Sequence, residues 1–115
     1  ADGRRVFKPE TIEFANIVRT TEDHRDPMYG NVPVNRGLGL LVGGDDGKAN
    51  FRSFGKTNTP RTFGHPGAGG QIAWGDPASG ISFGYCLDGF ADWIVQGRRT
   101  TALSSLAGSC ALNGR

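Results

Sequence analysis

The chain has 115 residues, of which 37% are hydrophobic and 19 are glycine, so its length allows at most one domain with a modest core. Its formal net charge is +2, and its 13 basic and 11 acidic residues are scattered along the sequence. This composition disfavours nucleic-acid binding, and no stretch has the length and apolar character of a membrane span. The N-terminal residues contain no signal region, which leaves the cellular location open.

The first predicted element is a short helix over residues 8–19. Pro9 suits the first helical position, and the glutamates that follow it suit the positive end of the helix dipole. Residues 20–34 are predicted to form a polar loop. The cluster Asp23-His24-Arg25-Asp26 in this loop allows a metal or proton-relay hypothesis, but such neighbours in a proline-bounded loop are typical of a solvated surface. We therefore predict no metal ion and no cofactor.

The middle of the chain predicts an antiparallel pair of strands. Residues 35–42 are typical of a strand, residues 43–47 of a turn, and residues 49–54 of a return strand. Residues 55–60 form the loop that follows.

A glycine-rich stretch over residues 63–74 comes next and has four glycines in its first eight positions. Glycine is useful where a backbone turns sharply or approaches another group closely. His65 lies among these glycines, and the pattern becomes apolar after Gly70. Residues 76–80 predict a tight turn and residues 81–87 a second strand. This arrangement is plausible for the wall of an active site.

The last predicted element is a helix that begins at Arg98, after an apolar connector over residues 90–95. Its apolar stripe comprises Leu103, Leu106, Ala107 and Cys110, at helical spacing. The two cysteines, Cys86 and Cys110, lack metal-like spacing and are predicted to be buried thiols, with their redox state open. Trp74 and Trp93 are predicted to be core aromatics.

One part of the sequence resembles a known family. The run Gly64-His65-Pro66-Gly67-Ala68-Gly69-Gly70-Gln71, followed by Asp76-Pro77-Ala78-Ser79-Gly80 and an apolar strand, resembles the third conserved box of the serine β-lactamase superfamily. The class C-like, esterase-like branch is the most similar, because His-x-Gly often stands there in place of Lys-Thr-Gly. The resemblance extends from about Pro9 to the C-terminus.

The resemblance implies a fold and a domain organisation. Residues 1–115 would be a single partial domain, the C-terminal portion of a β-lactamase-like serine hydrolase, with the catalytic serine missing. The expected fold class is α+β, with an antiparallel sheet and flanking N-terminal and C-terminal helices, as in the C-terminal part of the β-lactamase/transpeptidase fold.

The resemblance also implies roles for individual residues. His65 takes the role of the polar side chain near the nucleophile, and the backbone N–H of Ala68 helps to bind the oxyanion. Gly67 and Gly69 are the expected substrate-binding positions. Pro66 replaces the usual threonine or serine, so a hydroxyl that would contact a substrate carboxylate is absent. Ester or amide substrates are therefore favoured over β-lactams.

Two further motifs imitate boxes of this family. Ser53-Phe54-Gly55-Lys56 matches Ser-x-x-Lys, but the surrounding residues have no helical pattern and lie just before the third box. Tyr29-Gly30-Asn31 matches Tyr-x-Asn but precedes the serine. We predict that neither motif is functional.

Two classes of function remain open. The first is the hydrolase portion, acting in its intact parent on an ester, amide or β-lactam-like small molecule. The second is a non-catalytic binding or assembly module, in which His65 is a structural histidine. In the resembling fold the strand at residues 81–87 pairs with the missing N-terminal part, so we expect an unprotected edge there and therefore self-association or pairing with that part.

Overall fold

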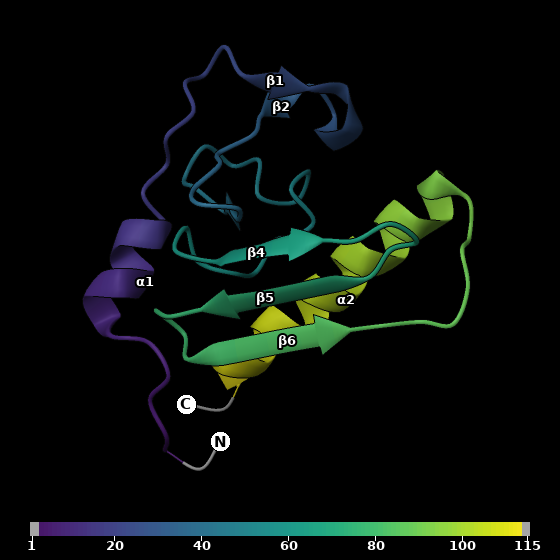
Figure 1. Ribbon diagram of the computed structural model, residues 1–115. Helices are drawn as coiled ribbons and strands as arrows, with labels where there is room; N and C mark the ends of the chain where they lie inside the picture. The colour runs from purple at the N-terminus through teal and green to yellow at the C-terminus, as the bar shows by residue number, and fades with distance from the viewer. Residues whose placement is uncertain (1–2, 114–115) are drawn as a thin grey trace.

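The computed structural model describes residues 3–113 and has an α+β architecture (Figure 1), which confirms the predicted class at this coarse level. The main sheet has four antiparallel strands in the order β3-β4-β5-β6, and a second, two-stranded sheet pairs β1 with β2. The elements are α1 Pro9–Ala15, β1 Arg25–Asp26, the 3₁₀-helix η1 Pro27–Tyr29, β2 Val32–Pro33, β3 Leu41–Val42, β4 Phe63–Pro66, β5 Ile72–Asp76, β6 Ile81–Tyr85 and α2 Trp93–Asn113.

The N-terminal helix α1 begins as predicted, with Pro9 at its start and Lys8 as the N-cap residue. It ends earlier than predicted, because Asn16 caps it directly after Ala15. None of its residues is buried, so α1 lies on the surface of the molecule and contributes little to the core.

The structure corrects the predicted pair of strands between residues 35 and 54. Only Leu41–Val42 forms a strand in the first segment, because the chain folds back at Gly37, whose N–H donates to the Leu40 carbonyl over 2.9 Å. Residues 49–53 form turns, and β3 pairs with β4 instead. The predicted return strand over residues 49–54 is therefore wrong.

A fully buried arginine explains why this segment turns. The guanidinium of Arg52 donates to the carbonyl of Pro33 over 2.6 and 2.9 Å and to the carbonyl of Gly43 over 2.7 Å. It also forms a bidentate pair with the Asp46 carboxylate, at 2.7 and 2.9 Å. We call these four residues the Arg52 clamp. The turns at residues 49–53 carry Arg52 to the position where its one guanidinium reaches all three partners.

Strands β4, β5 and β6 form an antiparallel meander (Figure 1), in which β6 is the predicted strand after the turn but ends at Tyr85 rather than at residue 87. The turn at residues 76–80 is confirmed, with the Gly80 N–H donating to the Asp76 carbonyl over 2.8 Å. Burial acts to raise the pKa of Asp76, but hydrogen bonds from Thr59, Ser79 and Ala78 outweigh it and lower the pKa. Gly64 is required because a Cβ atom there would overlap the Ala73 carbonyl and lie 2.7 Å from Trp74 Cα.

Helix α2 covers one face of this sheet (Figure 1), and its buried positions are the small residues Thr100, Ser104 and Gly108. Thr100 donates to the Gly70 carbonyl over 2.7 Å, and the Ser104 hydroxyl accepts from the Trp74 indole over 3.1 Å. The predicted apolar stripe is only partly buried, because Ala107 packs against the core cluster whereas Leu106 is 65% exposed and Cys110 is exposed. The helix also starts at Trp93 instead of Arg98.

The predicted burial of the cysteines is also wrong. Cys86 and Cys110 are free thiols, and both are exposed. Cys86 follows the end of β6, and Cys110 lies on the side of α2 that faces away from the sheet, because Thr100, Ser104 and Gly108 form the buried side.

The core is small and is formed by residues of the sheet together with Phe54 from the loop before β4, and Ala107 of α2 packs against it. Its buried cluster is Leu41, Phe54, Ile72 and Trp74. β6 is an edge strand of the sheet, with Ile81, Phe83 and Tyr85 half-buried and the alternating Ser82 and Gly84 exposed. Among residues 3–113, no helix is both long and apolar enough to cross a membrane.

Candidate functional site

His65 lies in the wall of a cavity of about 370 Å³, which we call the His65 cavity. Four segments that are distant in the sequence form it: η1, the turn before Phe54, the end of β4 with its following loop, and the first two turns of α2. The lining residues are Met28, Tyr29, Ser53, His65, Pro66, Gly67, Ala68, Gly70, Trp93, Gln96, Gly97 and Thr100. Three of the four predicted site residues, His65, Gly67 and Ala68, are therefore together at one cavity.

The edge of β4 is open at this cavity. β3 pairs with Phe63 and Gly64 only, so the chain from His65 to Ala68 has no strand on that side. The Gly67 N–H donates to the Gln71 carbonyl over 2.7 Å and closes the loop. Within residues 3–113 the N–H of Ala68 makes no hydrogen bond, and Ala68 is exposed. This N–H is thus available to an oxygen atom of a ligand.

The imidazole of His65 is exposed, and its Nδ1 lies 2.6 Å from the Pro66 carbonyl oxygen. A carbonyl oxygen accepts only, so in the neutral ring Nδ1 carries the proton and donates it to Pro66. The Nε2 atom is then left with its lone pair. His65 can therefore accept a proton at Nε2 while its Nδ1 is held by the backbone.

Gly69, the fourth predicted site residue, is buried and does not line the cavity. Its φ is +89°, and a Cβ atom there would lie 2.9 Å from the ring of Phe90. The loop conformation and the covering Phe90 ring account for a glycine at this position.

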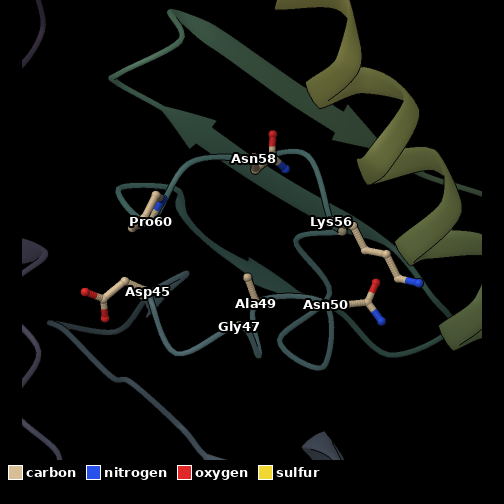
Figure 2. A pocket seen from close by; sticks show the side chains of 9 residues that line it. Asp45, Gly47, Ala49, Asn50, Lys56, Asn58 and Pro60 are labelled. Atoms are coloured by element: carbon tan, nitrogen blue, oxygen red, sulfur yellow. The ribbon is translucent and has the colours of Figure 1, made fainter. Parts of the chain in front are cut away.

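The serine and the lysine of the Ser53–Lys56 motif line two different cavities. Ser53 lines the His65 cavity, in a turn with φ of +72°, whereas Lys56 lines a separate cavity of about 310 Å³. In Figure 2 the side chains of Lys56 and Asp45 point away from each other at this second cavity. The expected lack of a helix here is confirmed. Lys56 is therefore not placed one helical turn from Ser53.

Sequence reasoning did not predict the cavity residues that come from η1 and α2, which are Met28, Tyr29, Trp93, Gln96, Gly97 and Thr100. Trp93 was predicted to be a core aromatic but is 79% exposed, whereas Trp74 is buried as predicted. Burial raises the pKa of Tyr29, and the charge of Arg36 partly opposes this rise. No local pattern identifies these residues, because η1 and α2 meet β4 only through the tertiary fold.

The segment predicted as a polar loop, residues 20–34, instead contains β1, η1 and β2, and Val32, Pro33 and Val34 in it are buried. The Nδ1 atom of His24 accepts the Thr21 N–H over 3.1 Å, which closes a local turn. In the part of the chain that the structure describes, no three His, Cys, Asp or Glu side chains are placed to hold a metal ion.

Comparisons of the chain with protein-family models, curated proteins and solved structures found no match. The candidate site therefore has to be interpreted from its own residues and geometry.

Proposed function

We propose that this chain is the C-terminal portion of a β-lactamase-like serine hydrolase and supplies the third-box wall of its active site. We base the proposal on the open edge of β4 and on the presence of both His65 and Ala68 in the lining of one cavity. The sequence resemblance assigns the same two residues to the reacting centre.

The proposed chemistry is acyl transfer. A serine hydroxyl of the parent protein adds to the carbonyl carbon of an ester or amide and gives its proton to a base, while the carbonyl π electrons move to the oxygen as negative charge. When the carbonyl re-forms, the bond to the alcohol or amine breaks, that leaving group takes up the proton, and an acyl-serine ester remains for water to hydrolyse. The N–H of Ala68 donates a hydrogen bond to the charged carbonyl oxygen, which is most valuable where charge develops. His65 exchanges a proton at Nε2 with the reacting groups. Gly67 leaves room for the substrate along the strand.

In this proposal the nucleophile lies on a part of the native protein outside this chain. Ser53 is the serine that lines the His65 cavity, yet Lys56 lines a different cavity. A serine without an adjacent base is a weak nucleophile. We therefore expect no covalent adduct when the chain alone is incubated with p-nitrophenyl butyrate and analysed by mass spectrometry. A stoichiometric adduct that Ser53→Ala removes would contradict the fragment proposal.

The alternative function is a non-catalytic binding or assembly module. It is favoured by the unpaired edge of β6 and by thirteen large hydrophobic side chains that are exposed among the described residues. The intact mass of the natively produced protein separates the two functions. A protein several hundred residues longer, with Ser-x-x-Lys on an upstream helix, supports the hydrolase; a mass close to 12.2 kDa supports the module.

The catalytic role of His65 is tested in the natively produced protein with His65→Ala. We expect kcat/KM for p-nitrophenyl butyrate to fall by about 10²- to 10⁴-fold, while the melting temperature changes little because the side chain is exposed. His24→Ala, which changes the other histidine, is the matched control and should retain activity. Unchanged kinetics together with a large loss of stability would show that His65 is structural.

A further inference from the structure

We propose that the His65 cavity binds an uncharged aryl amide or ester whose ring lies against Trp93 and Met28. The assignment of the carbonyl end rests on the proposed function, whereas the assignment of the ring end rests on the cavity itself. In this proposal Trp93 is the residue that determines which substrates the cavity accepts.

The lining of the cavity is uncharged. It contains no Lys, Arg, Asp or Glu, and its titratable side chains are Tyr29 and His65. Arg36 lies close enough to Tyr29 to affect its pKa, but Arg36 is paired with Asp26 at 3.7 Å and is not part of the lining. A carboxylate entering this cavity would lose hydration without gaining an ionic partner. The cavity therefore favours a neutral ligand.

Two large apolar side chains, Trp93 and Met28, line this cavity and are not part of the buried core. Trp93 is 79% exposed and Met28 is 87% exposed. They come from α2 and η1, two elements far apart in the sequence. Aromatic rings and thioethers are favourable surfaces for a bound ring, so their exposure at one cavity is consistent with a ring-binding end.

Trp93 and Met28 both lie at the start of a helix whose backbone N–H groups are capped by an aspartate. The carboxylate of Asp92 accepts the N–H groups of Ile94 and Val95 over 3.0 and 3.1 Å, which fixes the first turn of α2 behind Trp93. The carboxylate of Asp26 accepts the Met28 N–H over 2.9 Å and fixes η1 in the same way. Caps of this kind satisfy the free N–H groups of a helix start. The backbones that carry the two side chains are therefore preorganised.

The polar end of the site is the open edge of β4. The N–H of Ala68 is free to donate to a ligand carbonyl, and the volume of about 370 Å³ is within the ordinary range for small-molecule sites. In the proposed complex the ligand carbonyl accepts from the Ala68 N–H, and the aryl group of the ligand lies toward Trp93 of α2.

The test is a titration of the ¹⁵N-labelled chain with two stable amides, N-phenylbutanamide and its charged analogue 4-butanamidobenzoate. N-phenylbutanamide should shift the Trp93 indole and Ala68 amide resonances and leave the buried Trp74 indole unchanged. The carboxylate analogue should bind about tenfold more weakly or worse. Equal affinity for the two amides, or no shift at Trp93, overturns the proposal.

Trp93→Ala should weaken the binding of N-phenylbutanamide by about 5- to 10-fold, since the ring contact is lost. Leu106→Ala is the matched control, because Leu106 is an exposed apolar residue of the same helix outside the cavity. The readout is binding and not turnover. A failed His65→Ala test therefore removes the hydrolase proposal and leaves the ring site standing, and equal binding by Trp93→Ala removes the ring site alone.

Discussion

The replacement Asp46→Asn tests whether the Arg52 clamp stabilises the turn that leads to the His65 cavity. Arg52 is 0% exposed, and Asp46 is its carboxylate partner. The asparagine keeps one oxygen acceptor but removes the charge. The buried guanidinium then keeps its backbone acceptors and loses its counterion, which we expect to lower the free energy of unfolding by about 1 kcal/mol at pH 7, since Asp46 is one-third exposed.

The pH dependence gives the sharper measurement. The hydrogen bond from Arg52 is the main cause that lowers the pKa of Asp46 from 3.8 to about 2. That difference corresponds to roughly 2.5 kcal/mol, which solvent screening at a one-third exposed side chain reduces to about 1 kcal/mol. Since the folded-state pKa is the lower one, this stabilisation is present above pH 4 and is lost as the pH falls toward 2.

The assay is urea unfolding of the wild-type chain and the variant at intervals between pH 7 and pH 2. The wild type should lose about 1 kcal/mol more than Asp46→Asn over the acid range. Asp45→Asn, at the neighbouring exposed position, is the control and should follow the wild type. Identical pH profiles for the wild type and Asp46→Asn would refute the reasoning.

Two further predictions concern the sheet. Gly64→Ala should lower the free energy of unfolding by more than about 2 kcal/mol, because its Cβ atom meets the backbone of β5; Gly84→Ala, with open space around its Cβ position, should be neutral or slightly stabilising in the same urea assay. At micromolar concentration the chain should self-associate through the edge of β6, and light scattering should show that Ser82→Lys reduces this association whereas Ala102→Lys on α2 does not. A strictly monomeric wild-type chain would contradict the second prediction.

Local chemistry was sufficient to predict several elements of the fold. Pro9 starts α1, and the Asp76–Gly80 turn joins β5 to β6, because each feature depends on residues adjacent in the sequence. His65 and Ala68 were singled out by the family resemblance rather than by local chemistry, and the structure has both in the lining of one cavity, on β4 and the loop that follows it.

The errors arise where a long-range partner decides the structure. Residues 49–54 read as a strand because nothing local reveals that Arg52 reaches Pro33 and Gly43. The buried face of α2 was also mispredicted from its apolar stripe, because partners distant in the sequence decide which face is buried. The buried side of α2 carries small residues whose partners lie far away in the sequence: Ser104 accepts from Trp74 of the sheet, and a Cβ atom at Gly108 would meet the loop side chains of Thr57 and Asn58.

The distribution of apolar side chains has a calorimetric consequence. Seven large hydrophobic side chains are buried among the described residues, and thirteen are exposed. Unfolding such a chain exposes little new apolar surface, so its heat-capacity change should fall below the usual value of about 12 cal/mol/K per residue. An association that covers the exposed side chains buries much apolar surface, so its heat-capacity change should be large and negative. Such an association would tighten as the solution is warmed from the cold.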